Sequence, residues 1–133
     1  MADGESEALR LLEQFADGVG VGEHEPLVGC QAYPAYVGWL ALNGSPADMA
    51  LAFFANLESW DRSCARMRDA LEPRYGDEAV AFFHYFAETP PNFEERAREV
   101  VATGDAGPAR RAARLLQAYE LLYWDTLADA LQR

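Results

Sequence analysis

Apolar residues recur every three or four positions along most of this chain, and the clean alternation of a half-buried strand is almost absent. The clearest pattern runs from Met49 to Leu71, where the apolar positions fall on one face of a long helix. Glycine- and proline-rich breakers separate such stretches at regular intervals. The pattern predicts an all-α protein with helices over residues 6–17, 34–42, 46–71, 77–88, 92–103 and 108–131.

The start of the long helix carries the strongest local signal. Ser45 can accept a hydrogen bond from a free backbone N–H, and Pro46 suits the first helical position because it has no N–H to leave unpaired. Asp48 stands three residues after Ser45, where a capping box usually has Glu or Gln. These residues predict a sharp helix start at residue 46.

The last predicted helix places a carboxylate beside its apolar arc. With 100° per residue, Arg110, Arg114, Gln117 and Asp125 fall on the opposite face, while Glu120 is flanked by apolar positions. Such a Glu is suited to general-acid catalysis, because burial favours its protonated form. The alternative is that Glu120 is partly exposed at the edge of the apolar arc. The arc itself is predicted to contain Leu115, Leu116, Leu122, Tyr123, Thr126, Leu127 and Ala130.

Two charged residues also project onto the apolar side of the long helix. Asp61 and Arg68 lie two turns apart, between positions that carry aromatic and aliphatic side chains. We expect an ion pair, either within this helix or with a neighbouring helix, that fixes the helix register, and the alternative is a substrate-binding carboxylate at Asp61. The Phe and Trp residues of this helix are expected to belong to the hydrophobic core rather than to line a ligand-binding pocket.

Composition limits the classes of partner. The chain has 133 residues, enough for one domain over residues 1–133, and carries 11 basic against 22 acidic residues, a formal charge of −11. Nucleic acids and anionic membranes require a positive surface, so neither is expected as a partner. A small uncharged or cationic ligand in a pocket remains compatible with this charge.

The residues that usually hold metals or cofactors are sparse. Cys30 and Cys64 have no metal-type spacing, and neither His24 nor His84 has a carboxylate three residues before it, the spacing of an E-x-x-H metal site on a helix. No phosphate-binding or hydrolase motif is present. We therefore predict no metal and no cofactor. The chain has no secretory h-region and no apolar run that could span a bilayer, which predicts a cytoplasmic protein.

Three segments, in this order, resemble the TenA/thiaminase-2 family. Ala32-Tyr33-Pro34-Ala35-Tyr36 opens a helix, residues 52–60 read AFFANLESW on the long helix, and residues 119–125 read YELLYWD on the last. The similarity extends from about Leu9 onward, and the final segment is its most specific part. The resemblance implies a heme-oxygenase-like helical bundle, of which this chain would be the carboxy-terminal part.

The resemblance also implies a function and a set of site residues. The family hydrolyses thiamin or the aminopyrimidines of its breakdown, so this chain would be an aminopyrimidine-binding protein or hydrolase of thiamin salvage. Glu120 matches the proton-transferring Glu and is the predicted catalytic residue. The predicted substrate-binding residues are Tyr33, Asn56, Trp60, Phe86 and Tyr123.

Two departures from the family change the expectation. The family's nucleophilic Cys falls on Asn56 here, and Cys64 lies more than two turns further along. An amide cannot replace a thiolate nucleophile, which favours binding without the Cys route. The family's opening helices, with a pyrimidine-binding Asp, have no counterpart in this sequence. Either an apolar face would be covered by a second copy or a partner protein, or the start of the chain is a truncation. The alternative function is a non-catalytic helical interaction or oligomerisation module.

Overall fold

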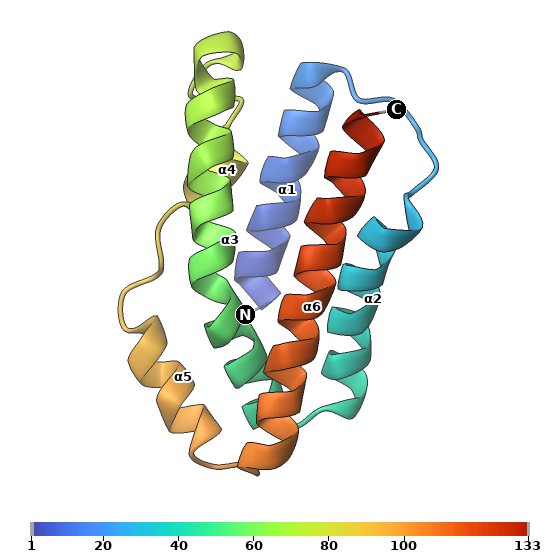
Figure 1. Ribbon diagram of the computed structural model, residues 1–133. Helices are drawn as coiled ribbons and strands as arrows, with labels where there is room; N and C mark the ends of the chain where they lie inside the picture. Colours follow the sequence, from blue (N-terminus) through green and yellow to red (C-terminus); the bar gives the residue numbers. More distant parts are fainter. Residues whose placement is uncertain (1, 133) are drawn as a thin grey trace. The chain divides into compact units, whose positions relative to one another are not determined.

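The computed structural model describes residues 2–132, which form helices and no strand (Figure 1). The all-α class predicted from the periodicity is confirmed for this part of the chain, whereas the heme-oxygenase-like arrangement stays a prediction. The helices are α1 (Ala2–Val19), α2 (Val28–Asn43), α3 (Pro46–Tyr75), α4 (Ala81–Phe86), α5 (Phe93–Val101) and α6 (Ala106–Leu131).

The contacts within the chain divide it into two compact units. Unit 1 comprises Met1–His24 and Glu58–Pro90, and unit 2 comprises Glu25–Leu57 and Pro91–Arg133. The long helix α3 begins in unit 2 and ends in unit 1. The expectation of one domain over residues 1–133 stays a prediction.

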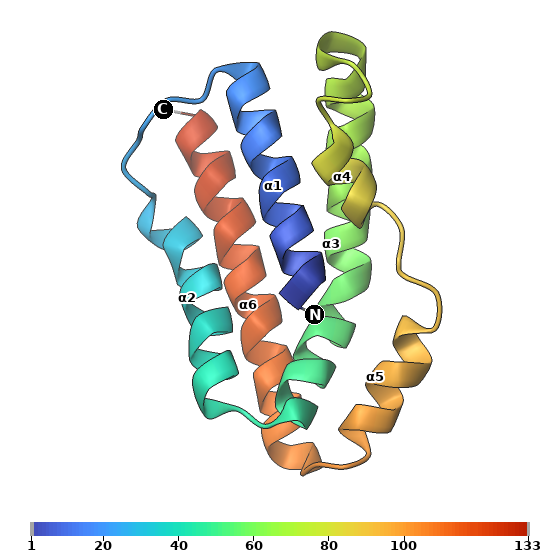
Figure 2. The same cartoon turned by 180° about the vertical axis from the view of Figure 1, so that it is seen from behind.

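Unit 2 is built around α2 and α6, which lie side by side and antiparallel in both views (Figures 1 and 2). Its buried apolar cluster consists of Leu40, Ala52, Ala112 and Leu116 from α2, α3 and α6. Alanine and glycine bring the helices close together. A Cβ on Gly29 would lie 1.9 Å from Oγ1 of Thr126 on α6. The small side chains of this core therefore set the distance between its helices.

Helix α2 begins six residues before the predicted Pro34. The backbone N–H of Gln31 already bonds to the Leu27 carbonyl at 2.9 Å, and Pro34 lies inside the helix. Leu27 gives no side-chain cap, so no start signal marks this end in the sequence. Close packing of Gly29 against α6 accompanies the early start, a tertiary contact that local patterns do not contain.

The predicted start of α3 is confirmed in detail. The backbone N–H of Ser45 donates to Asp48 Oδ2 at 2.7 Å, and the N–H of Asp48 donates to Ser45 Oγ at 3.2 Å, a reciprocal capping box. The predicted end at Leu71 is too early. The helix continues through Pro73 to Tyr75 and stops at Gly76, whose φ of 86° closes it as a left-handed cap.

Unit 1 has an aromatic core around α4. Cys64, Val80 and Phe83 are buried, and the ring of Phe15 on α1 packs edge-on against Phe83 at 5.0 Å. The predicted helix over 77–88 is wrong at both ends, since α4 covers only Ala81–Phe86. Residues 77–80 form a turn instead, in which the Val80 N–H bonds to the Asp77 carbonyl at 3.2 Å.

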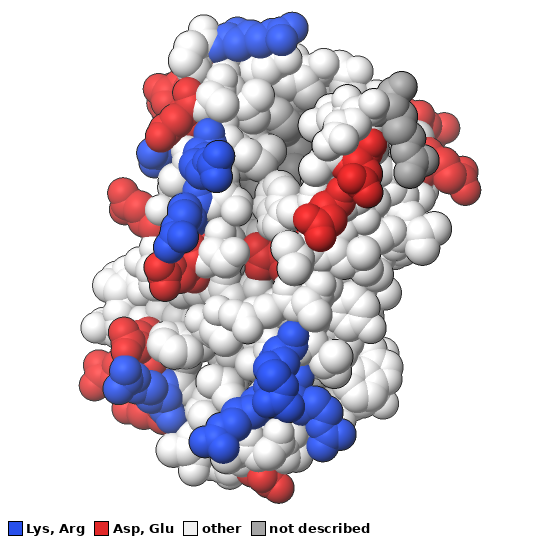
Figure 3. Space-filling model, viewed as in Figure 1, with Lys and Arg blue, Asp and Glu red and all other residues white. Residues whose placement is uncertain are grey.

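Helix α6 buries a different arc from the one predicted. Leu115 and Leu122 are exposed, and its buried residues are Ala109, Ala112, Ala113, Leu116 and Glu120. The polar face is as expected, with Arg110, Arg114, Gln117 and Asp125 exposed. Figure 3 shows arginine side chains gathered over the first turns of α6, where Arg110, Arg111 and Arg114 are exposed. The buried arc is thus centred nearer to Glu120 than the periodicity predicted.

Candidate functional site

Three helices of unit 2 bring predicted site residues together. Tyr33 lies on α2, Asn56 on α3, and Tyr123 on α6. The side-chain amide Nδ2 of Asn56 donates to the Tyr33 hydroxyl at 3.2 Å, and the Tyr33 and Tyr123 rings lie 6.2 Å apart with a tilt of 53°. These three residues therefore lie together in unit 2, and their role in ligand binding stays a prediction.

The position of Glu120 in unit 2 can be described relative to the buried apolar cluster. Ala52 and Leu116 share the buried cluster, and Asn56 and Glu120 each follow one of them by one helical turn. The side chain of Gln117 on α6 also donates to the Ala55 carbonyl on α3 at 3.0 Å. Asn56 and Glu120 therefore each lie one turn beyond the shared cluster, on two helices that contact each other.

The burial of Glu120 excludes one of the two interpretations of this residue, and its role as a general acid stays a prediction. Its side chain is 3% exposed, so the interpretation of Glu120 as a partly exposed residue at the edge of the apolar arc is wrong. Its Oε1 accepts a hydrogen bond from the indole Nε1–H of Trp124 at 3.1 Å, four residues further along α6. A carboxylate this deep costs several kcal/mol unless it is hydrogen-bonded, paired or protonated, so the indole contact is a specific compensation.

Asn56 is equally buried, at 3% exposed. Its Nδ2 is satisfied by Tyr33, but its Oδ1 has no hydrogen-bond partner among the described residues. A buried acceptor without a partner costs about 1–3 kcal/mol. Unit 2 thus holds a hydrogen-bond acceptor that a donor from outside the described residues could satisfy.

The two remaining predicted ligand contacts lie in unit 1. Trp60 comes from the second part of α3 and Phe86 from the end of α4, and their rings pack edge-on with centroids 5.9 Å apart. Both border the buried cluster of Cys64, Val80 and Phe83. Within unit 1 these rings are core residues, as the simpler interpretation of the aromatic stripe expected.

The expected ion pair between Asp61 and Arg68 is wrong. Asp61 is 8% exposed and accepts a hydrogen bond from the Thr89 hydroxyl at 2.5 Å, while Arg68 pairs with its neighbour Asp69 at 2.8 Å. Helix projection placed both charges on the apolar side but could not show that Thr89, 28 residues on, would reach Asp61. Burial raises the pKa of the Asp61 carboxyl, and the Thr89 hydrogen bond opposes that shift.

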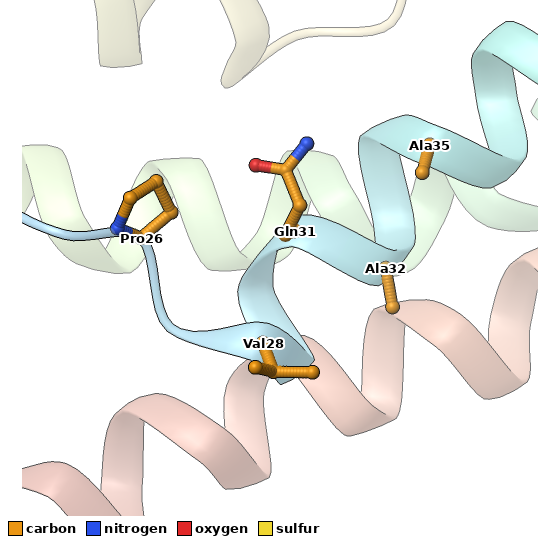
Figure 4. A pocket seen from close by; sticks show the side chains of 5 residues that line it. All are labelled: Pro26, Val28, Gln31, Ala32 and Ala35. Atoms are coloured by element: carbon orange, nitrogen blue, oxygen red, sulfur yellow. The ribbon is translucent and has the colours of Figure 1, made fainter.

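A shallow surface depression of about 530 Å³ lies elsewhere in unit 2. Figure 4 shows the side chains that line it, all on the start of α2 or just before it: Pro26, Val28, Gln31, Ala32 and Ala35. None of the predicted site residues is among them. The depression is open and mainly apolar, so it offers contact area rather than catalytic groups.

Two contacts at the site were missed by the sequence analysis. The hydrogen bond from the Trp124 indole to Glu120 was not predicted, although the i, i+4 spacing could have suggested it. Gln117 was assigned only to the polar face, but its amide reaches the α3 backbone. The first has a sequence signal, and the second depends on how α3 and α6 pack.

Comparison of the chain with protein-family models, with curated proteins and with solved structures found no match. The resemblance to the TenA/thiaminase-2 family therefore stays a prediction. Among the described residues, none of the helices combines the length and the apolar character needed to cross a membrane.

Proposed function

We propose that unit 2 binds a small planar ligand of the aminopyrimidine class at the group formed by Tyr33, Asn56, Glu120 and Tyr123. The observation that carries the proposal is the deep burial of two polar side chains in unit 2, Asn56 on α3 and Glu120 on α6, each 3% exposed. A scaffold gains nothing from such groups, because apolar residues of the same shape would pack there at lower cost. A ligand with matching N–H donors makes use of them.

The chemistry of the group matches this class of ligand. Asn56 Oδ1 and the Glu120 carboxylate are acceptors, and an aminopyrimidine presents an exocyclic amino group and ring nitrogens in one plane. The tilted rings of Tyr33 and Tyr123 supply aromatic faces for contact with a heterocycle. The proposal is for binding, because the amide of Asn56 supplies no nucleophile; Glu120 is the group that would transfer a proton in any hydrolysis.

A thermal-shift experiment tests this proposal. Thiamin and 4-aminopyrimidines are added to the purified full chain, and a ligand at a hundredfold excess over its dissociation constant stabilises the folded state by about 2.7 kcal/mol. We expect the shift to shrink strongly in Glu120→Gln and in Asn56→Leu. The matched control is Glu99→Gln, the same change at an exposed residue of unit 2, which should shift like the wild type. Absence of any shift in a folded wild-type protein would contradict the proposal.

A second candidate function rests on a different surface. Helix α2 exposes an apolar stripe, formed by residues at helical spacing. The stripe consists of Val28, Ala35, Trp39 and Leu42, and Leu42 is 86% exposed. An open stripe of this kind favours a helical interaction module, with a second copy of the chain as partner. Light scattering after size-exclusion chromatography tests it. A dimer that dissociates in Trp39→Glu but persists in the control Leu121→Glu would support this candidate, and a monomeric wild type would exclude it.

A further inference from the structure

Three side chains with metal-binding atoms converge where α3 is connected to α4 in unit 1. Glu72 lies near the end of α3, Asp77 in the turn that follows, and His84 on α4. One ligand atom from each lies within 4.8 Å of the others, and His84 Nε2 is 2.8 Å from Asp77 Oδ1. An imidazole and two carboxylates thus meet at one point facing solvent.

The backbone around this point is held by the core of unit 1. The left-handed φ of Gly76 turns the chain after α3, and its N–H bonds to the Glu72 carbonyl at 2.8 Å. Val80 is fully buried between Asp77 and His84, and Phe83, next to His84, is also buried. The segment carrying the ligand atoms is therefore anchored on both sides by packed side chains rather than by a loose loop.

Glu72 is open to a cation, whereas Asp77 and His84 contact each other and would exchange that contact for the ion. The Glu72 carboxylate has no hydrogen-bond or ion-pair partner within residues 2–132. The nearest arginine in sequence, Arg74, places its guanidinium over the Tyr75 ring at 5.1 Å. The presence of His84 distinguishes the group from an ordinary acidic cluster, because imidazole nitrogen favours zinc-type ions over Mg²⁺ and Ca²⁺.

We propose that Glu72, Asp77 and His84 form a binding site for one divalent transition-metal ion of the zinc type. Ligand distances of about 2.0–2.2 Å require only small side-chain adjustments from the present arrangement, and three protein ligands leave one position for water. The ion ties the end of α3 to α4. The expectation of no metal at His84 considered only the E-x-x-H spacing along one helix, whereas these ligands lie seven and twelve residues earlier.

Isothermal titration calorimetry with Zn²⁺ tests the site on the full chain after treatment with a chelator. We expect one equivalent to bind, and binding to weaken at least about tenfold in His84→Ala and in Asp77→Asn. The matched control is His24→Ala, which removes the other histidine of the chain, in an exposed segment, and should bind like the wild type. Asp77 is 80% exposed, so we expect Asp77→Asn to fold normally even if His84→Ala disturbs the fold.

Several results would overturn the proposal. Zn²⁺ affinity equal to wild type in both His84→Ala and Asp77→Asn would show that the ion binds elsewhere. Loss of binding in Cys30→Ser would assign the ion to a thiol instead. Mg²⁺ bound as tightly as Zn²⁺ would indicate a simple acidic surface, and a wild type without saturable Zn²⁺ binding would remove the site altogether.

Discussion

The two units bury different kinds of side chain. The core of unit 1 contains Cys64, Val80 and Phe83, bordered by the rings of several aromatic residues. Unit 2 instead packs small residues, and it holds three of the buried polar side chains seen in the described residues, Asp48, Asn56 and Glu120, against Asp61 alone in unit 1. Asp48 caps a helix, Asn56 donates to Tyr33, and Glu120 accepts from Trp124. The two units thus differ in how much polar burial they hold, and the proposed binding of a ligand is assigned to the unit that holds more of it.

The largest effect is expected in the aromatic core. Phe83→Ala removes a ring that is 4% exposed and packs edge-on against Phe15 and Phe82 at 5.0 and 5.3 Å. We expect the free energy of unfolding to fall by about 3–5 kcal/mol. Urea denaturation measures this, with the exposed Leu121→Ala as control, for which a change within about 0.5 kcal/mol is expected. A loss under about 1 kcal/mol would contradict the comparison between the units, because the stability of unit 1 would then not depend on its aromatic side chains.

The next effect concerns the close helix approach in unit 2. Gly29→Ala places a Cβ 1.9 Å from Thr126 Oγ1, so α2 and α6 must move apart or Thr126 must turn, and we expect a loss of about 1–3 kcal/mol. Gly38→Ala is the matched control on the same helix, because a Cβ there meets nothing within 4 Å. It should stabilise by about 0.5–1 kcal/mol through helix propensity. Equal thermal unfolding of the two variants would contradict the tight packing of small residues.

A smaller effect is expected at the start of α3. Ser45→Ala removes the hydroxyl that accepts the Asp48 N–H, while the Asp48 carboxylate can still accept from the backbone of residue 45. We expect a loss of about 1 kcal/mol, which chemical denaturation can resolve. An unchanged midpoint would show that the capping box adds nothing in this unit and would leave Asp48 as a further unexplained buried carboxylate.

The smallest effect, with a distinct pH dependence, is expected at Asp61. Its pKa in the folded state is raised above the unfolded value of about 3.9, so the folded state binds more protons in the window just above pH 3.9. The contribution of Asp61 to the free energy of unfolding therefore falls as the pH rises through that window. Asp61→Asn should remove this contribution and become more stable relative to wild type as the pH rises, and the exposed Asp125→Asn should not. A stability difference between wild type and Asp61→Asn that does not change across the window would contradict the assignment.

Local signals in the sequence predicted the parts of the fold that depend on neighbouring residues. The capping box of Ser45 and Asp48 and the polar face of α6 follow from spacing alone. The early start of α2 could not be predicted, because it involves Gly29 packing against a helix almost a hundred residues later. The short α4 was missed because the turn at residues 77–80 is closed by backbone hydrogen bonds that leave no strong sequence pattern.

At the candidate site, too, the sequence predicted what depends on neighbouring residues and missed what depends on tertiary packing. Helix projection put Glu120 next to apolar positions, but only packing against α2 and α3 decides that it is buried. The pairing of Asn56 with Tyr33 joins residues 23 positions apart, and the cluster at His84 joins three segments around a turn. Side chains that meet through tertiary structure leave no fixed spacing, so the sequence could name candidates without showing which of them meet.

The most direct test of the central claim is a nuclear magnetic resonance titration of the isotope-labelled chain with thiamin or a 4-aminopyrimidine. The account predicts saturable shifts of the side-chain amide of Asn56, the indole N–H of Trp124 and the backbone amides near Tyr33 and Tyr123, with unit 1 signals such as those around Phe83 little changed. Shifts confined to unit 1 or to the exposed stripe of α2, or no saturable shifts at all, would contradict the assignment of ligand binding to the buried polar group of unit 2.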